Sequence, residues 1–408
     1  MSQAVSPQAA LAQAVPPQAA AIAGVYEYPS RFAPGTTMLR IKADCAAHAL
    51  DDAGLSWGDV DAVYDAGESG PGMGLFISEY FGLSPRVLDT TAVGGSSFEF
   101  HAAHAARDLA AGRARVALLT YGSTSRSRSL PIGTGARASD TPLPASNMDS
   151  PYGLPLVGSY AMAARRHMYQ YGTTPEQLAE IAVTARAHAV RNPDAMRALA
   201  DLGIKRTGEL AVDDVLASAM IADPLHLLDC CIISDGGGAV VIVAAELVPG
   251  IRKAPVWILG TGEAVGYRGN DKDLTVSAAA LSGPPAFAQA GVRPDEIDVA
   301  MIYDSFTITT LMALEDLGFC AKGEGGPYAE GGRLRYDRPG APGLNTDGGG
   351  LSSNHPGMRG IFLLIEATRQ LRGESTAQVP GARLAVAHGN GGQLANQHAA
   401  ATIVLGAG

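Results

Sequence analysis

The sequence contains the same succession of helix-like and strand-like segments twice. The first copy has a helical segment at 38–52, a glycine stop within 53–55 (Ala-Gly-Leu), an acidic loop and a strand-like segment at 60–64. The second copy has 290–292 (Ala-Gly-Val), another acidic loop and a strand-like segment at 299–303. A glycine directly after a helical segment is a common helix stop. Such a repeat constrains the fold strongly, because it indicates one architecture that is built twice.

A second pair of segments recurs in the same order. Residues 94–97 (Gly-Gly-Ser-Ser) open a helical segment that leads to the strand-like segment 116–121. In the other half, 354–357 (Asn-His-Pro-Gly) open a helical segment that leads to 384–388. Strands that alternate with helices favour an α/β fold with buried sheets. The alternative is that two unrelated strand–helix units simply look alike.

The repeats divide the chain into halves at 21–265 and 266–408, after a tail at 1–20 that is rich in Ala, Gln and Pro. The tail lacks the basic start and the sustained apolar run of a secretory signal, so no such signal is expected, and we predict a flexible tail. The first half carries a long insertion at about 123–230, in which Thr174 is the predicted N-cap of a helix. Loops that run over the ends of sheets often determine substrate selectivity, which we expect of this insertion.

Composition and charge exclude several classes of protein. The net charge is −10 and no run of Lys or Arg occurs, so a nucleic-acid partner is not expected. The most apolar stretch, 239–245, is far too short to span a bilayer, and we expect a soluble cytoplasmic protein. The four cysteines, at 45, 230, 231 and 320, lack the paired spacing of a zinc site, and no metal is expected. Glycine accounts for 50 of 408 residues, which we assign to tight turns and close backbone approaches.

Six short motifs are spread over both halves. They are Tyr-Gly-Thr-Thr-Pro-Glu-Gln-Leu at 171–178, Arg-Asn-Pro at 191–193, Ser-Asp-Gly-Gly-Gly-Ala at 234–239, Tyr-Asp-Ser-Phe-Thr at 303–307, Asn-His-Pro-Gly at 354–357 and His-Gly-Asn-Gly-Gly at 388–392. In this order they resemble the thiolase superfamily, in particular its sterol-carrier-protein thiolase branch. The resemblance implies a duplicated five-layer αβαβα fold of the α/β class, a homodimeric core and an acyl-coenzyme A substrate. No cofactor is implied beyond the coenzyme A thioester itself.

The residues at the thiolase catalytic positions depart from the thiolase pattern. A thiolase has a nucleophilic cysteine at the start of the first repeat's helix, and here that position falls on Gly95 or Ser96. A serine hydroxyl is a far weaker nucleophile than a thiolate. The resemblance places His388 at the second catalytic cysteine, His355 at the oxyanion-hole histidine, and Tyr303 where other branches have Asn or His. We expect imidazole groups with a pKa near 6.5 and a tyrosine hydroxyl to transfer protons here.

The missing thiolate favours aldol chemistry over Claisen chemistry. Retro-aldol cleavage needs a base for the substrate hydroxyl, donors for the enolate and an acid for its α-carbon, and Tyr303, His355 and His388 can fill these roles. The pattern is similar to the steroid side-chain aldolases of the lipid-transfer-protein type. We therefore predict a retro-aldolase that cleaves a branched β-hydroxyacyl-CoA, such as a steroid or bile-acid side chain, to a ketone or aldehyde and a short acyl-CoA. Two alternatives stay open: an acyltransferase that uses Ser96, and a non-catalytic thiolase-like scaffold subunit.

Further residues are candidates for substrate contacts. Arginine side chains can bind the coenzyme A phosphates, although surface arginines without a role would look the same. The glycine run at 348–350 would let the pantetheine arm approach, and Asp304 is expected to satisfy loop amides. The resemblance also implies a small partner protein with a zinc ribbon and an OB-fold, which the aldolases of this branch need. The substrate-contact candidates are Arg126, Arg128, Gly349, Gly350, Arg359 and Gly391.

Overall fold

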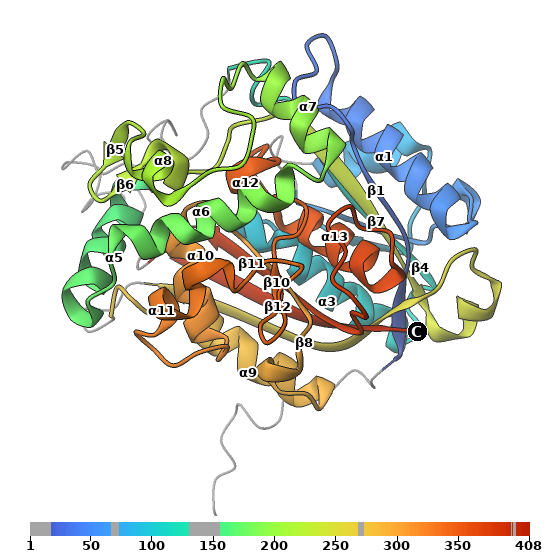
Figure 1. Cartoon of the computed structure of the whole chain (residues 1–408). Coiled ribbons are helices and arrows are strands. Elements are labelled where there is room, and N and C mark those ends of the chain that lie inside the picture. The colour runs from blue at the N-terminus through green and yellow to red at the C-terminus, as the bar shows by residue number, and fades with distance from the viewer. Residues whose placement is uncertain (1–17, 67–72, 130–155, 268–272, 393, 395–396) are drawn as a thin grey trace, which may run out of the picture.

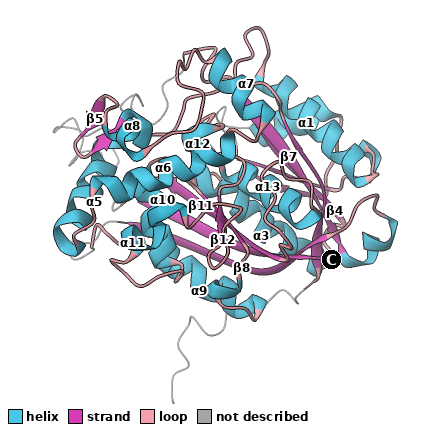
Figure 2. Cartoon of the chain, viewed as in Figure 1, coloured by secondary structure: helices cyan, strands magenta, loops and turns pink. Residues whose placement is uncertain are grey.

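The computed structural model describes residues 18–66, 73–129, 156–267, 273–392, 394 and 397–408. Most of the predicted tail, and residues 130–155 of the predicted insertion, lie outside the described residues. The described residues form both helices and strands (Figure 2), and among them no helix is long and apolar enough to cross a membrane. The cytoplasmic location stays a prediction.

Ten strands form one sheet, in the order β10-β9-β11-β12-β8-β1-β7-β4-β2-β3. The strands of the first half are β1 (Ala20–Glu27), β2 (Ala62–Asp65), β3 (Val87–Asp89), β4 (Val116–Ser123) and β7 (Gly236–Ala244). Those of the second half are β8 (Val256–Tyr267), β9 (Val299–Ile302), β10 (Gly343–Leu344), β11 (Leu384–Gly392) and β12 (Gln397–Ala407). A separate hairpin consists of β5 (Met220–Ala222) and β6 (Leu225–His226).

The two halves have the same topology. From the centre outward, the orders β1-β7-β4-β2-β3 and β8-β12-β11-β9-β10 match strand for strand. In both halves the first two pairings are antiparallel and the last two are parallel. The halves meet where β1 and β8 pair antiparallel, at Ala21 with Trp257 and Ile22 with Val256. The duplication expected from the sequence is therefore confirmed.

The boundary expected at residue 265 is wrong, because it cuts through β8. The halves divide between β7 and β8, and the glycines of β8 explain why this strand looks like a loop in the sequence. A Cβ on Gly260 would lie 2.0 Å from the Ala286 carbonyl oxygen, so the strand packs directly on a helix backbone. Gly24 of β1 has an equivalent place, because a Cβ on it would lie 2.1 Å from the Ala49 carbonyl oxygen.

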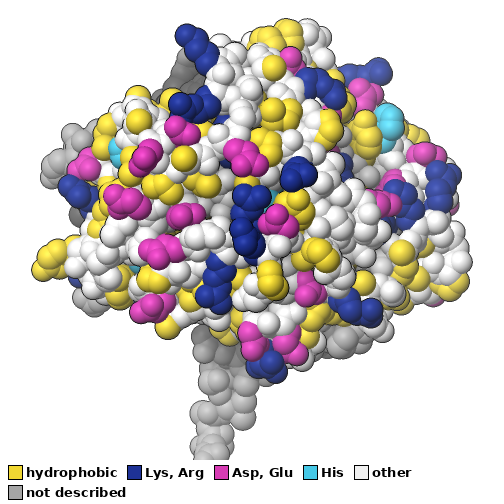
Figure 3. Space-filling model, viewed as in Figure 1, with side chains coloured by type: hydrophobic (Ala, Val, Ile, Leu, Met, Phe, Trp, Pro, Cys, Tyr) yellow, Lys and Arg dark blue, Asp and Glu magenta, His cyan; other side chains and the backbone are white. Residues whose placement is uncertain are grey.

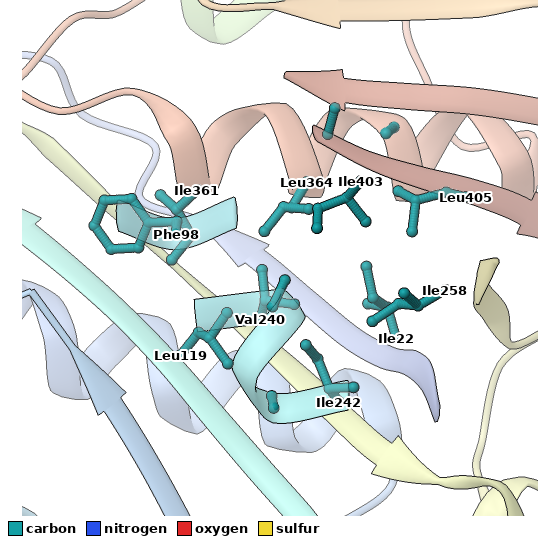
Figure 4. Packing of buried hydrophobic residues seen from close by; sticks show 14 of the residues in the cluster. Ile22, Phe98, Leu119, Val240, Ile242, Ile258, Ile361, Leu364, Ile403 and Leu405 are labelled. Atoms are coloured by element: carbon teal, nitrogen blue, oxygen red, sulfur yellow. The ribbon is translucent and has the colours of Figure 1, made fainter. Parts of the chain in front are cut away.

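Helices cover both faces of each half-sheet, so the helices and the two half-sheets together form five layers. The helices α3 (Ser97–Ala110) and α13 (Gly360–Arg372) lie in the middle and share a core with side chains from both half-sheets (Figure 4). Outside the first half-sheet lie α1 (Met38–Ala53) and α2 (Met73–Phe81), and outside the second lie α9 (Ala279–Ala290) and α10 (Thr307–Asp316). The αβαβα arrangement is thus confirmed, with the two sheets joined edge to edge.

Local signals place the helix ends as the sequence predicts. The equivalent helices α1 and α9 stop at Gly54 and Gly291, whose φ angles of 77° and 69° are left-handed and favour glycine. In the insertion, the Thr174 side chain accepts a hydrogen bond from the Gln177 amide and caps the following helix. The insertion helices are α5 (Leu156–Tyr171), α6 (Pro175–Ala189), α7 (Pro193–Asp201) and α8 (Val212–Leu216), and the remaining short helices are α11 (Gly325–Ala329) and α12 (Gly349–Ser352).

The insertion packs on the second half of the molecule. Helix α6 contacts α10, α11 and α12, and α5 contacts α10 (Figure 1). An apolar cluster joins α5 to α10 through Tyr160, Phe306 and Met312. Through these contacts the insertion covers the carboxyl ends of β9 and β11, where the candidate catalytic residues lie.

The surface carries both signs of charge. On the face shown in Figure 3, basic and acidic side chains are interspersed and form no large patch of one sign.

Candidate active site

Tyr303 and His355 form a hydrogen-bonded pair. Tyr303 directly follows β9, and its backbone amide donates to the His388 carbonyl of the neighbouring strand β11 at 3.0 Å. His355 comes from the loop between α12 and α13. The Tyr303 hydroxyl and His355 Nε2 are 2.9 Å apart, and the two rings meet edge to face with their centroids 5.5 Å apart. The structure thus brings together two residues that are 52 positions apart in the sequence.

His388 lies beside this pair on β11. Its Nδ1 hydrogen-bonds the Thr402 hydroxyl at 2.9 Å, and that hydroxyl is 2.9 Å from the Ser282 hydroxyl. Tyr303 and His388 both line a cavity of about 10 Å³, which has room for about one water molecule. All three predicted catalytic side chains are at least 96 % buried, since their exposed fractions are 2–4 %. The site is therefore a closed pocket with little access to bulk water.

Burial keeps the three side chains uncharged. It lowers the pKa of His355 to about 4, with the Arg359 charge adding to the effect. Burial lowers the pKa of His388 to about 3 and raises that of Tyr303 well above 10. The expectation of imidazoles with a pKa near 6.5 is contradicted, because burial disfavours the imidazolium. At neutral pH each imidazole has one hydrogen-bond donor and one acceptor, and the Tyr303 hydroxyl keeps its proton.

Gly95, rather than Ser96, faces the catalytic side chains. A Cβ on Gly95 would lie 2.3 Å from Cε2 of Tyr303 and 2.5 Å from the Asn390 carbonyl oxygen. The Tyr303 ring thus fills the space that a side chain at position 95 would need. The Ser96 hydroxyl is fully buried and donates to the backbone carbonyls of Val93, at 3.2 Å, and Ala399, at 3.4 Å.

A buried charge network supports the loops that carry Tyr303 and His355. Arg359 Nε donates to Asp304 at 3.1 Å, and its Nη2 donates to both Asp347 oxygens at 2.7 and 2.6 Å. Its Nη1 donates to the Asn354 side-chain oxygen at 2.6 Å. Asp304 follows Tyr303 in the chain and Asn354 precedes His355. One guanidinium group therefore holds the neighbours of both catalytic residues.

This network corrects one predicted substrate contact. Arg359 is fully buried in ion pairs, and its predicted contact with coenzyme A phosphates is wrong. Asp304 packs beside Gly349 and Gly350, and its carboxylate would lie 2.1 Å from a Cβ on Gly349, so close packing accounts for these glycines and their contact with a pantetheine arm stays a prediction. The Gly350 and Leu351 amides donate to this carboxylate at 2.8 and 3.2 Å. The expectation that Asp304 satisfies loop amides is confirmed.

The other predicted contacts have different surroundings. Arg126 and Arg128 are exposed on the loop after β4, and their role in binding coenzyme A stays a prediction. A Cβ on Gly391 would lie 1.8 Å from the Val93 carbonyl oxygen, so this glycine allows β11 to approach the loop before α3. Close packing is a sufficient reason for glycine there, and substrate contact at Gly391 stays a prediction.

Several cavity residues were missed by the sequence reasoning. Tyr160 of the insertion lines the cavity, and its hydroxyl accepts a hydrogen bond from Asn390 Nδ2 at 3.0 Å. Asn390 lies two residues after His388 on β11, and side chains at this spacing share a face of a strand. This alternation of side chains along the strand could have identified Asn390 as a cavity residue from the sequence. The other lining residues are Ser277, Thr309, Met312, Ala313 and Leu394.

Known proteins with similar sequences cover most of the chain. An acetyl-CoA acetyltransferase of Methanothermobacter thermautotrophicus is 34 % identical over 362 residues, which are 84 % of this chain and 88 % of that protein. A steroid side-chain-cleaving aldolase of Thermomonospora curvata is 32 % identical over 387 residues, which are 89 % and 92 % of the two chains. The family model of the thiolase C-terminal domain matches residues 262–407. The chain belongs to the thiolase superfamily.

A solved structure supports this assignment. The structure named Ltp2-ChsH2(DUF35) aldolase superposes with a TM-score of 0.84 at 29 % identity, over 96 % of this chain and 98 % of that one. A 17-hydroxy-3-oxo-4-pregnene-20-carboxyl-CoA lyase of Mycobacterium tuberculosis is 30 % identical and covers 85 % of this chain and 90 % of that protein. The thiolase-superfamily relatives thus include both acyltransferases and carbon–carbon lyases, and the residues of the site must decide between these reactions.

This thiolase-superfamily member lacks an activated thiol near Tyr303. Burial raises the pKa of Cys231, whose charge would be felt at Tyr303, and so disfavours the nucleophilic thiolate. Among the residues that the structure describes, no group of three or more His, Cys, Asp or Glu side chains is arranged to hold a metal ion. The polar side chains of Tyr303 and His388 line the cavity, and His355 hydrogen-bonds Tyr303, so we take these three residues as the candidate catalytic groups.

Proposed function

We propose that this chain is a retro-aldolase that cleaves a branched β-hydroxyacyl-CoA, such as a steroid or bile-acid side chain, to a ketone or aldehyde and a short acyl-CoA. The observation that carries the proposal is the Tyr303–His355 pair at 2.9 Å, with the Tyr303 ring against Gly95 where a thiolase cysteine would stand. A tyrosine and a neutral imidazole can move a proton and hold an oxyanion, but they cannot form the acyl-enzyme of a thiolase. Two relatives named as an aldolase and a lyase favour the same reaction.

The geometry suggests how the proton moves. Because burial disfavours tyrosinate, Tyr303 takes the proton of the substrate hydroxyl as it gives its own proton to His355 Nε2. The C–O bond then becomes a carbonyl, the carbon–carbon bond breaks, and its electron pair passes into the thioester as an enolate. The proton on His355 offsets the charge of the transient enolate, and because burial lowers the pKa of His355 to about 4, His355 readily gives this proton up again. The proton then passes back through Tyr303 to the α-carbon, so both residues regain their starting protonation states. His388, whose Nδ1 is held by Thr402 and whose Nε2 is left for the cavity, hydrogen-bonds the substrate during this second transfer.

The decisive experiment supplies a tertiary β-hydroxyacyl-CoA and measures ketone release. The purified protein, tested alone and with its partner, should release ketone and a short acyl-CoA in equal amounts. Tyr303→Phe should lower kcat by at least 100-fold, since general acid–base catalysis contributes about 10²–10⁴-fold. Acetyl transfer to coenzyme A without any ketone would contradict the proposal.

Acyl transfer is the second candidate, because the acetyltransferase relative is 34 % identical. The Ser96 hydroxyl argues against it, since both of its hydrogen bonds go to backbone carbonyls and neither to a basic side chain. Intact-mass measurement after incubation with acyl-CoA separates the two reactions. An acyl adduct on Ser96 indicates acyl transfer, and its absence together with ketone release indicates aldol cleavage. The scaffold alternative requires that neither activity occurs.

We also propose that the chain acts with a small zinc-ribbon and OB-fold protein. The basis is the superposition on an aldolase whose name includes a DUF35 component, together with the branch resemblance. Co-expression with a DUF35-type protein should give a complex in size-exclusion chromatography, and ketone release should rise when that protein is added. Equal activity with and without it would contradict a required partner.

A homodimer is proposed from the free edge of the first half-sheet. Strand β3 ends the sheet, and beside it several large apolar side chains are exposed, including Leu88 at 39 % and Phe76 at 55 %. A hollow of about 850 Å³ lies along the same edge. Light scattering should give twice the chain mass for the wild type and the single mass for Leu88→Lys. A wild-type monomer over the micromolar range would contradict this proposal.

A further inference from the structure

The insertion contributes a buried tyrosine to the catalytic cavity. Tyr160 of α5 is 1 % exposed and lines the cavity together with Tyr303 and His388. Its ring stacks at a tilt against Phe306, with the centroids 4.8 Å apart, so the ring is held between α5 and the start of α10. The hydroxyl end of a buried tyrosine needs hydrogen-bond partners. These partners determine what Tyr160 can do.

The Tyr160 oxygen accepts a hydrogen bond from the active-site strand. Asn390 Nδ2 donates to this oxygen at 3.0 Å. A tyrosine oxygen has two lone pairs and one O–H donor. Among the described residues, no acceptor is placed to receive the Tyr160 O–H. Its proton is therefore left for a group that enters the cavity.

We propose that Tyr160 is a further catalytic residue, whose O–H donates a hydrogen bond to the thioester oxygen on which the enolate charge develops. This assignment rests on the proposed function for the substrate class. Tyr160 is unsuited to act as the base, since burial favours its protonated form and Asn390 already donates to its oxygen. A donor fixed by Phe306 and Asn390 needs no reorganisation when the charge appears, which is the condition for effective stabilisation of an oxyanion.

Tyr160 and His355 then have complementary tasks in the same step. The hydroxyl proton leaves through Tyr303 to His355, the carbon–carbon electron pair moves into the thioester, and the enolate oxygen accepts hydrogen bonds without taking a proton. Burial raises the pKa of Tyr160, so it stays protonated throughout. The proton held at His355 returns to the α-carbon afterwards, so no proton is gained or lost overall. The insertion thereby supplies a catalytic group as well as any substrate selectivity.

The test compares Tyr160→Phe with Tyr64→Phe. Both substitutions remove one buried hydroxyl, and Tyr64 binds Asp108 at 2.5 Å between β2 and α3, apart from the cavity. Tyr160→Phe should lower kcat for ketone release by about 10²–10³-fold, as loss of one oxyanion donor does, with KM changed less than threefold. Tyr64→Phe should keep kcat within about twofold of the wild type. Thermal unfolding of both variants checks that they fold.

A second measurement isolates enolate formation. In D₂O, the protein should exchange the α-hydrogens of a short acyl-CoA such as propionyl-CoA, and Tyr160→Phe should slow this exchange by the same factor as cleavage. Wild-type exchange without any ketone release would overturn the proposed function, and the effect of Tyr160→Phe on exchange would still decide the role of Tyr160. A folded Tyr160→Phe variant with wild-type exchange and cleavage, or with a change in KM alone, would overturn the role of Tyr160.

Discussion

A methyl group at position 95 is expected to disable the site. In Gly95→Ala the new Cβ would lie 2.3 Å from Cε2 and 2.4 Å from Cζ of Tyr303. Ordinary carbon contacts begin near 3.4 Å, so the Tyr303 ring must move by about 1 Å. A displacement of that size takes the 2.9 Å bond between Tyr303 and His355 out of hydrogen-bond range.

The magnitude follows from two separate effects. Overpacking of a buried site costs about 1–3 kcal/mol, and the Asn390 carbonyl at 2.5 Å from the new Cβ is backbone that cannot rotate away. Misplacing a reacting group by about 1 Å costs about 10²-fold in rate. Gly95→Ala should therefore lose about 1–3 kcal/mol of unfolding free energy and about 100-fold in kcat.

Urea unfolding and ketone release measure the two effects. Gly250→Ala is the matched control, because a Cβ on Gly250 meets nothing within 4 Å and its φ is not positive. The control should match the wild type in both measurements. Wild-type stability and wild-type kcat for Gly95→Ala would refute the placement of the Tyr303 ring against Gly95, and with it the reason why no nucleophile stands there.

Two further predictions concern buried ionisable side chains near the site, Arg359 and Glu99. Arg359→Lys keeps the charge but cannot bind Asp304 and Asp347 together, so urea unfolding should show a loss of about 3 kcal/mol, as for a broken buried ion pair, and ketone release should fall with it. Unchanged stability would contradict this role of Arg359. Burial raises the pKa of Glu99 well above 4.5, and neither of its carboxyl oxygens has a hydrogen-bond partner among the described residues. The stability linked to its protonated form is complete below the unfolded pKa and is lost as pH rises toward the folded pKa, so Glu99→Gln should match the wild type near pH 4 and exceed it at pH 8 in urea unfolding. A stability difference that does not change between these pH values would contradict a protonated Glu99.

The parts of the fold that local signals encode were predictable from the sequence. Gly54 and Gly291 end equivalent helices because the residue there must adopt a left-handed conformation. Glycine favours that conformation, so each helix end could be recognised from one residue in the sequence. The role of Gly260 has no such local signal. Gly260 lies inside β8, where a Cβ would come within 2.0 Å of the α9 backbone, and a contact across layers cannot be recognised from neighbouring residues in the sequence.

The site itself was predictable in its residues but not in its environment. The motifs containing Tyr303, His355 and His388 could be recognised, whereas the burial that keeps all three uncharged depends on the whole fold. The burial of Arg359 was likewise not predictable, since nothing in the sequence distinguishes a buried arginine from one on the surface. Tyr160 meets Asn390 across 230 residues of chain, and only the packing of the insertion reveals that contact.

The duplication also allows the proposed catalytic cavity to be compared with the equivalent strand ends of the first half. The ladders of β2 with β4 and of β9 with β11 run in the same register, and their fourth pairs are Asp65 with Thr120 and Ile302 with His388. In the first half, the Lys42 ammonium fills this position by donating to Asp65 at 2.6 Å, and Thr120 donates to the same oxygen at 3.2 Å. In the second half, Ile302 and His388 hold the equivalent positions, and His388 lines the cavity. In the first half, the bonds to Asp65 from Lys42 and Thr120 offset part of the desolvation that a buried ion pair costs. The first repeat thus has an ion pair at the strand ends where the second has residues that we propose for chemistry.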